Sequence, residues 1–356
     1  MKKILLFTGC CMLLASCNTL TSFSLGSFFS RWKKTSKTLY LEAYSPEETS
    51  LNMVKVTDES TTPVIAGTSS TLYNATYVNL DAPKGISRSA LFTWNTHPVL
   101  AISPDGKKLA YCTRNNGLDN VMVCNTGTQG MTTQRTFRNV HSFCWGNDGY
   151  LYFSDMNGDN HYICSVNAEQ GSMMSQHTSG NVDDISPVVS LDGKTIFFTR
   201  LGNGAPSIWS LDKKNSTLTL CSNGYNPCVI PGDKEAFYCV RNSTAGRSEI
   251  WYVNYVKGQE SLVLADVNKS FTNPSVSPDG KWLLCVGNSL SNISKKQNLD
   301  IYVVRTDGSR LTQLTFHPET DTCPVWGKDG RSIFFVSTRA NKEKHFNVWR
   351  MNFNLE

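Results

Sequence analysis

The stretch Ser277-Pro278-Asp279-Gly280-Lys281-Trp282-Leu283-Leu284-Cys285 joins a tight turn to an uninterrupted apolar run. Proline presets the backbone for the second position of a type I turn, aspartate bonds the local backbone, and glycine takes the left-handed position. The apolar run does not alternate with polar residues, and this is typical of a strand that is buried on both faces. The stretch therefore predicts a hairpin whose second strand lies between two packed layers.

The same kind of turn recurs along the chain, and each copy precedes an apolar run. Six copies have their aspartates 41 to 50 residues apart, at Asp105, Asp148, Asp192, Asp233, Asp279 and Asp329. A period of this length is typical of β-propeller blades with four strands each. We therefore predict an all-β fold, a six-bladed β-propeller. Seven blades are the alternative, if residues 38–85 form a degenerate blade rather than a small β-rich segment.

The end of the chain leaves no room for a fourth strand in the last blade, which stops near Phe353. Just before the first blade, residues 91–98 resemble the fourth strand and loop of the fifth blade. We expect residues 89–95 to supply the missing outer strand, because a propeller closed in this way has no exposed sheet edge.

Composition limits the classes of function. Of 356 residues 40% are hydrophobic, enough to build a large core, and this excludes a wholly disordered chain. The formal net charge of +5 is too small to make nucleic acid the expected partner.

The N-terminus looks like a bacterial export signal. Lys2 and Lys3 precede an apolar stretch at residues 4–15 that is too short to span a bilayer. Leu14-Ala15-Ser16-Cys17 then resembles a lipobox, which implies cleavage after residue 16 and acylation of Cys17. Asn18 favours the periplasmic side of the outer membrane over the inner membrane. We expect a signal peptide at residues 1–16, a lipid-anchored tether at 17–37, a β-rich segment at 38–85 and the propeller at 86–356.

Nine cysteines remain after Cys17, an odd number that cannot all pair within one chain. Most lie in apolar runs, where a buried thiol behaves as a small hydrophobic group. Cys221 and Cys228, separated by a short loop, are the candidate disulfide, and two unpaired thiols are the alternative.

The repeats at residues 103–111 and 274–282, and the later elements at 300–303 and 307–315, resemble those of the TolB-like β-propeller superfamily. The resemblance covers roughly residues 91–353. It implies a non-catalytic, protein-binding scaffold in the cell envelope, of the kind found in the Tol–Pal system, with a Pal-like or other lipoprotein as partner. The chain departs from TolB itself in its lipobox and in the short segment between Cys17 and the ring.

Catalytic patterns are sparse. The sequence contains no Gly-x-Ser-x-Gly nucleophile elbow and no two histidines at metal-ligand spacing, so we expect no enzyme, metal or cofactor. A carbohydrate-binding or lyase-like protein that uses the channel mouth is the alternative. Loops that lead into the first strand of a blade reach the channel mouth of a propeller. The polar residues that they carry are our candidates for binding: Asn95, His97, His141, Asp183, Asp184, Asn226, Asn273 and Asp321.

Replacing Cys17 with serine tests the proposed anchor, because acylation needs the thiol. We expect Cys17→Ser to move the protein from the membrane fraction to the soluble fraction, and labelled palmitate to enter only the wild type. A wild-type protein that never takes up palmitate would exclude the anchor.

Overall fold

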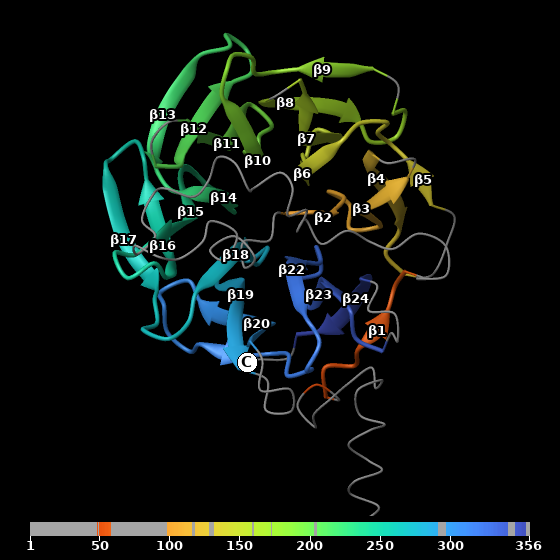
Figure 1. The fold of residues 1–356 in the computed structure, drawn as a ribbon, viewed down its shortest axis with the longest axis vertical. Helices are drawn as coiled ribbons and strands as arrows, with labels where there is room; N and C mark the ends of the chain where they lie inside the picture. The colour runs from red at the N-terminus through yellow and green to blue at the C-terminus, as the bar shows by residue number, and fades with distance from the viewer. Residues whose placement is uncertain are drawn as a thin grey trace, which may run out of the picture.

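A computed structural model gives the fold of the chain (Figure 1). It describes Glu48 and residues 50–57, 98–115, 118–127, 132–158, 160–171, 173–202, 205–290, 297–340 and 346–353. These residues form six antiparallel sheets of four strands each, arranged as a ring around a central channel. The six-bladed propeller is therefore confirmed. In this part of the chain no helix is both long and apolar enough to cross a membrane.

Each blade runs from an inner strand beside the channel to an outer strand at the rim. The first blade consists of β2 (Leu100–Ile102), β3 (Lys108–Asn115), β4 (Leu118–Asn125) and β5 (Thr133–Gln134). The second consists of β6 (Val140–Trp145), β7 (Tyr150–Asn157), β8 (Asn160–Asn167) and β9 (Met174–Gln176). The third consists of β10 (Asp183–Val189), β11 (Thr195–Leu201), β12 (Ser207–Asp212) and β13 (Leu218–Asn223).

The other three blades continue the ring. The fourth consists of β14 (Tyr225–Ile230), β15 (Asp233–Asn242), β16 (Ser248–Asn254) and β17 (Gln259–Leu264). The fifth consists of β18 (Phe271–Val276), β19 (Trp282–Leu290), β20 (Gln297–Arg305) and β21 (Thr312–Gln313). The sixth consists of β22 (Asp321–Trp326), β23 (Ser332–Ser337), β24 (Asn347–Asn352) and, from far earlier in the chain, β1 (Val54–Lys55).

The recurring turn has the geometry that its residues predict. In the fifth blade, Ser277 Oγ donates to Asp279 Oδ1 at 2.6 Å and accepts the N–H of Trp282 at 2.9 Å. Gly280 is left-handed, with φ of 73°. The serine and aspartate thus satisfy the turn internally and set the register of the apolar strand that follows.

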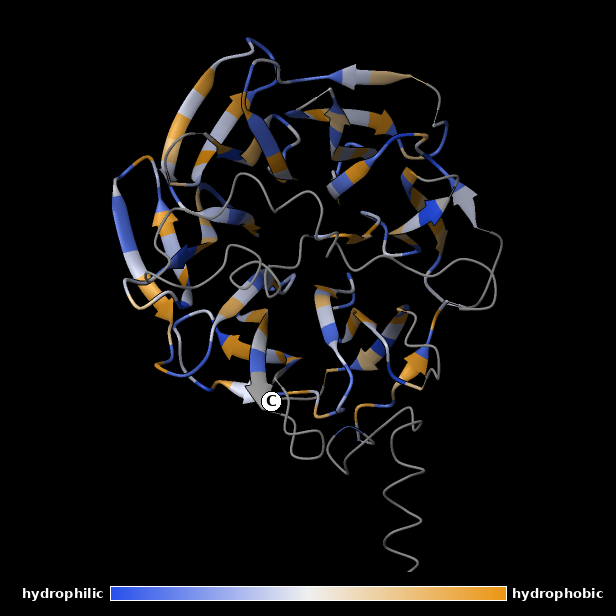
Figure 2. Ribbon diagram, viewed as in Figure 1, coloured by the Kyte–Doolittle hydropathy of each residue, from blue (hydrophilic) through white to orange (hydrophobic). Residues whose placement is uncertain are grey.

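The second strand of each blade packs on both faces. In β19, Leu284 belongs to the core shared with the sixth blade, whereas Leu283 and Cys285 belong to the core shared with the fourth. All three side chains are fully buried, and each such leucine stabilises the fold by about 1.5–3 kcal/mol. Figure 2 shows hydrophobic positions on the strands of all six blades. Neighbouring blades therefore hold one another through side chains that alternate along one strand.

The ring closes through the N-terminal segment, but at a different place from the one we expected. Strand β1 pairs with β24, and the Val56 N–H donates to the carbonyl oxygen of Val348 at 2.8 Å. We expected residues 89–95 here; they lie outside the described residues, and β1 occupies the position. The earlier segment suits it because Met53 and Val56, both buried, enter the two cores that flank the sixth blade.

A buried ion pair holds the same segment. One carboxylate oxygen of Glu48 accepts the N–H groups of Phe316 and His317 at 2.6 and 3.2 Å, and Arg339 Nη2 at 3.3 Å. Arg339 also binds Asp321, with Nε 3.3 Å from Oδ1. The side chains of Glu48, Asp321 and Arg339 have no exposed surface. A buried cation between two acids thus ties the N-terminal segment to the last blade.

The candidate disulfide does not form, and Cys221 and Cys228 are both unpaired thiols. Cys221 lies on the outer strand β13 and packs in the core between the third and fourth blades. Cys228 lies on the inner strand β14 and packs in the core between the fourth and fifth. The two side chains therefore enter different cores. The signal peptide, the tether and most of segment 38–85 lie outside the described residues and stay predictions.

Truncating Glu48 tests the closure. We expect Glu48→Ala to destabilise the protein by about 1–3 kcal/mol, because the N–H groups of Phe316 and His317 lose a fully buried acceptor while Asp321 still balances the charge of Arg339. The matched control is Glu169→Ala, which removes an exposed pair with Lys108 and should cost at most about 1 kcal/mol. Equal unfolding free energies for the two variants in a urea titration would contradict this account of closure.

Candidate functional site

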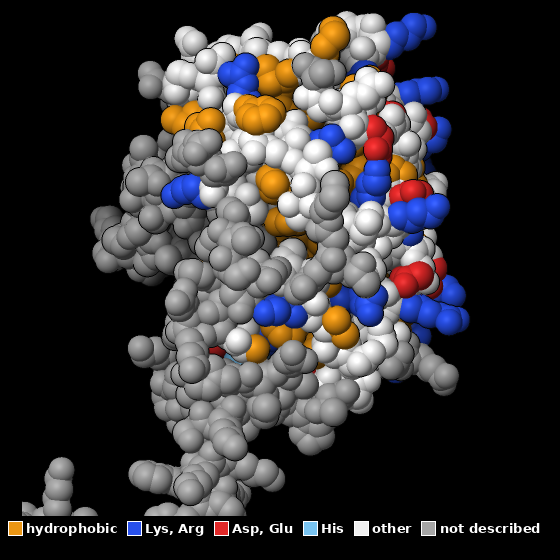
Figure 3. Space-filling model, turned by 90° about the vertical axis from the view of Figure 1, so that its right-hand side faces the viewer, with side chains coloured by type: hydrophobic (Ala, Val, Ile, Leu, Met, Phe, Trp, Pro, Cys, Tyr) orange, Lys and Arg blue, Asp and Glu red, His pale blue; other side chains and the backbone are white. Residues whose placement is uncertain are grey.

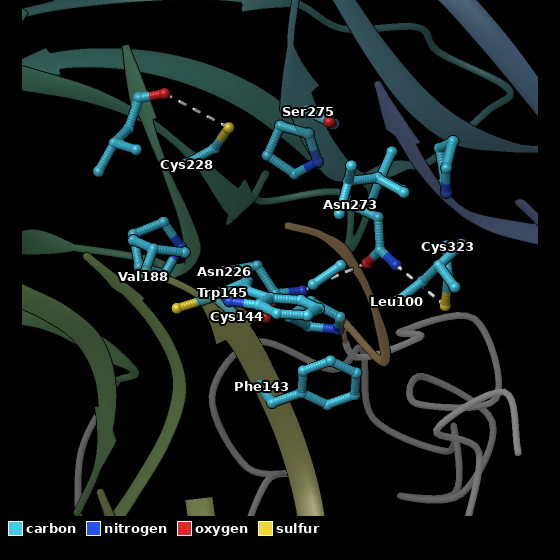
Figure 4. Close-up of a pocket in the computed structure, with 18 residues that line it drawn as sticks. Leu100, Phe143, Cys144, Trp145, Val188, Asn226, Cys228, Asn273, Ser275 and Cys323 are labelled. Atoms are coloured by element: carbon cyan, nitrogen blue, oxygen red, sulfur yellow. Dashed lines mark hydrogen bonds between the residues drawn. The ribbon is translucent and has the colours of Figure 1, made fainter. Parts of the chain in front are cut away.

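The inner strands of the blades surround an apolar cavity of about 210 Å³ in the central channel (Figure 4). Four prolines from four blades line it, together with hydrophobic and thiol side chains: Pro98, Pro227, Pro274 and Pro324, with Phe143, Cys144, Trp145, Val188, Cys228 and Val229. A cavity of this size and character suits an apolar side chain or a short peptide segment better than a charged molecule.

A ring of hydrogen bonds joins neighbouring inner strands at this cavity. Ser186 Oγ donates to Asn226 Oδ1 at 2.8 Å, and Asn226 Nδ2 donates to Asn273 Oδ1 at 3.5 Å. Asn273 Nδ2 in turn lies 3.8 Å from the sulfur of Cys323 (Figure 4). The ring thus crosses four consecutive blades, from the third to the sixth. We call these four residues the channel ring.

The channel ring is built from strained backbone. Ser186, Asn226, Asn273 and Cys323 have φ values of 49° to 51°, the left-handed region, and a proline follows each of them. Each lies where the pairing between the first and second strands shifts, a β-bulge. Such a conformation costs on the order of 1–3 kcal/mol and is concentrated at functional sites in proteins. Asparagine tolerates it better than most residues do, which suits Asn226 and Asn273.

Among the predicted binding residues, Asn226 and Asn273 therefore come together at the channel, although their role in binding stays a prediction. Asn95 and His97 lie outside the described residues.

Asp184 and Asp321 require a correction, because we expected them to face a ligand. Both are fully buried. Asp184 binds Arg200 through two hydrogen bonds of 2.7 and 2.9 Å, and Asp321 binds Arg339. Replacing Asp184 with alanine would leave the largely buried Arg200 without its carboxylate, and replacing Asp321 would leave Arg339 with Glu48 alone, so either change should destabilise the fold. Their carboxylates form ion pairs within their own blades and do not face the channel as ligand-binding groups.

His141 and Asp183 belong to a second polar cluster, together with His161 and Asp155. The backbone N–H and Nδ1 of His161 lie 2.9 and 2.7 Å from Asp183 Oδ1, and the two imidazole rings are 5.2 Å apart. Nε2 of His161 and Oδ1 of Asp155 are both buried without a hydrogen-bond partner. We call these four side chains the histidine cluster.

The electrostatics of the histidine cluster follow from burial. Burial, together with the neighbouring ring of His161, holds the pKa of His141 well below its usual range. Burial also raises the pKa of Asp155, against the opposing charge of Arg138. A neutral His141 is therefore the stable form at neutral pH, able to accept or donate a hydrogen bond without carrying charge.

His161 and Asp155 were not among the predicted site residues. Asp155 stands in an acidic, glycine-containing hairpin that reads as an ordinary loop, and His161 follows that loop. Their position in the blade could have identified them. The hairpin between the second and third strands of a blade lies at the same end of the blade as the loop that enters its first strand. Within the described ranges, no three His, Cys, Asp or Glu side chains form a group able to hold a metal ion.

No family model matches the sequence, and no curated protein matches it either. Solved structures do match in fold. TolB from Acinetobacter baumannii is 16% identical, with a TM-score of 0.56 over 70% of this chain and 64% of that one. A putative TolB from Agrobacterium tumefaciens is 16% identical, with a TM-score of 0.53 over 72% of this chain and 90% of that one.

An oligogalacturonate lyase from Vibrio parahaemolyticus shares the fold as well. It is 11% identical, with a TM-score of 0.51 over 85% of this chain and 97% of that one. This chain spans less than two thirds of the Acinetobacter TolB. The chain therefore has the six-bladed TolB-like propeller fold, which TolB proteins and an oligogalacturonate lyase share, so the fold alone does not give the function.

The low pKa of His141 predicts a pH dependence of stability. The unfolded chain protonates this histidine near pH 6.5, whereas the folded protein resists protonation, so the unfolded state binds more protons below that pH. Stability should therefore fall as the pH is lowered from about 7.5 to about 5. We expect this fall in melting temperature to be smaller in His141→Gln. An equal fall in both proteins would show that His141 does not titrate in this range.

Proposed function

We propose that this chain is a cell-envelope lipoprotein whose propeller binds a protein partner at the channel mouth and catalyses no reaction. The observation that carries the proposal is the apolar, proline-lined cavity with Asn226, Asn273 and Cys323 of the channel ring in its wall. Such a site offers apolar surface and amide hydrogen bonds, which recognise a peptide segment or an inserted side chain. The partner, by resemblance to Tol–Pal components, is an envelope protein such as a Pal-like lipoprotein.

The chemistry of the cavity wall supports binding over catalysis. Of the described residues that line it, only the cysteines can ionise within the ordinary range of catalytic groups. Burial raises the pKa of Cys144 and of Cys228 to about 12, so both stay protonated thiols at neutral pH. A protonated, buried thiol is a poor nucleophile and a poor metal ligand. The wall thus supplies shape and hydrogen bonds.

The proposed location follows from the sequence. Acylation of Cys17 would place the protein at the membrane surface, on the periplasmic side of the outer membrane. The TolB-like fold fits a periplasmic envelope protein.

A second candidate is a carbohydrate-binding or lyase-like activity. It is favoured by the histidine cluster, in which a buried imidazole nitrogen and a carboxylate oxygen have no partner. The fold itself also occurs in an oligogalacturonate lyase. This candidate requires a polysaccharide to reach His161 and Asp155, which are both buried.

Filling the cavity separates the two candidates. Ser275 lines the channel, and Ser275→Trp should occupy much of its 210 Å³. The matched control is Ser261→Trp, which adds the same side chain to the exposed outer strand β17. We expect crosslinking in cells, followed by mass spectrometry, to identify an envelope protein with wild type and with Ser261→Trp, at several-fold lower yield with Ser275→Trp.

The enzymatic alternative has its own measurement. Purified protein is incubated with polygalacturonate, and unsaturated products are followed by ultraviolet absorbance. Product formation by the wild type would overturn the scaffold proposal, and its loss in His161→Ala would place the activity at the histidine cluster. Identical crosslinking yields for the two tryptophan variants, with no product, would place the protein interface outside the channel.

A further inference from the structure

A second hollow lies away from the channel, at the junction between the last and the first blade. Its volume is about 370 Å³, and the turns of both blades line it. Asp105 and Thr126 contribute from the first blade, and Lys328, Asp329 and Arg350 from the last. We call it the junction hollow. Figure 3 shows that Lys and Arg side chains are interspersed with Asp and Glu along one side of the molecule.

Cross-blade ion pairs neutralise charges of this kind at three other junctions. Lys108 pairs with Glu169 at 2.5 Å between the first and second blades. Asp148 pairs with Lys213 at 2.8 Å, and Asp192 pairs with Lys234 at 3.0 Å, at the next two junctions. In the described part of the chain, neither Lys328 nor Arg350 takes part in an ion pair of this kind.

Both cations also break the pattern of the repeat. The residue that precedes the turn aspartate is Lys328 in the last blade and an uncharged residue in the others: Pro104, Asn147, Leu191, Gly232 and Pro278. Arg350 lies opposite Phe334 in the ladder between the second and third strands. The equivalent residues of the other blades are all uncharged: Val123, Ser165, Ser210, Tyr252 and Val303. The repeat thus accommodates uncharged residues at both positions, and the blade needs neither cation to fold.

The junction hollow holds one buried donor without an acceptor among the described residues. Arg350 Nε is buried and has no hydrogen-bond partner, a costly arrangement for a charged group. Lys328 is exposed at the turn, so its ammonium group is open to an anion from solution, and partial desolvation lowers its pKa.

The two carboxylates that also line the hollow form their hydrogen bonds within their own turns, although the charge of Arg350 contributes, after those bonds, to the lowered pKa of Asp329. Asp105 Oδ1 accepts Ser103 Oγ at 2.6 Å and the N–H of Lys107 at 3.0 Å, both within its own turn. Asp329 accepts the N–H groups of Arg331 and Ser332 at 2.9 and 2.8 Å. These acids stabilise their turns.

We propose that the junction hollow binds an oxyanion, the phosphate or carboxylate group of a small polar molecule, between Lys328 and Arg350. The planar guanidinium of arginine matches the paired oxygens of both groups, and the lysine adds a point charge. A hollow of 370 Å³ is large enough for a small metabolite that carries such a group. Binding there would also add a contact between the first blade and the last, at the junction where the ring closes.

Titration calorimetry on the full chain tests the site, with sodium phosphate and sodium acetate as probes at constant ionic strength. We expect saturable binding of at least one probe, and the probe that binds identifies the group. Lys328→Gln and Arg350→Gln should each weaken binding by about tenfold or more, since each removes a charge-assisted hydrogen bond. The matched control is Arg331→Gln, which removes one positive charge from the same turn at an exposed residue outside the lining, and should change affinity by less than about twofold.

Circular dichroism checks that each variant is folded, and Lys328→Gln alone decides the outcome if Arg350→Gln is not folded, because Lys328 is exposed at a turn. Absence of saturable binding of both probes to the wild type would overturn the proposal. So would equal affinities for wild type and Lys328→Gln, since the anion would then lie elsewhere. Ser275→Trp should leave anion binding unchanged, so the outcome does not depend on the function of the channel.

Discussion

The closure of the ring is the constraint on which the rest of the structure depends. Each internal blade is connected to its neighbours by the chain itself, but the sixth blade ends at β24 with an open edge. The short strand β1 covers this edge, and Met53 and Val56 extend the two adjacent cores beneath it. Glu48 completes the attachment by neutralising Arg339 where no water reaches. Because the blades pack in a circle, the position of every inner strand around the channel depends on this joint.

The closed ring forms a channel lined by the inner strands of the blades. Five inner strands carry bulges, and at four of them a left-handed residue followed by proline turns the backbone toward the axis. The resulting wall is rigid, apolar and crossed by amide hydrogen bonds. Rigidity reduces the entropy lost when a partner segment is bound, so a channel of this kind suits recognition. The histidine cluster lies in the second and third blades and adjoins the channel ring through Ser142, whose Oγ lies 3.4 Å from His141 Nδ1 and accepts the N–H of Ser186 at 2.8 Å.

The sequence predicts the repeating parts well because each turn is specified locally. The bonds among Ser277, Asp279 and Gly280 need no distant residue, so the turn can be recognised from four positions. The closing strand could not be assigned in this way. Only two of its residues, Val54 and Lys55, pair with β24, and their partners lie almost three hundred positions away in the sequence. The prediction that Asp184 faces a ligand was wrong for a related reason. Its partner Arg200 is brought opposite it by the register between β10 and β11, which the sequence does not reveal. Asn226 and Asn273 could be placed near the channel because they lie where the chain enters the first strand of a blade, a position that recurs along the repeat.

The attachment of the N-terminal segment also decides how the protein would bear a mechanical load. A force that pulls on the chain before Glu48 reaches the ring first at the Glu48–Arg339 pair and only then at the hydrogen bonds between β1 and β24. The load therefore enters at the joint that closes the ring, where the contact between β1 and β24 is only two residue pairs long. Tension on this segment would open the propeller from its last blade, and the widened ring would change the shape of the channel.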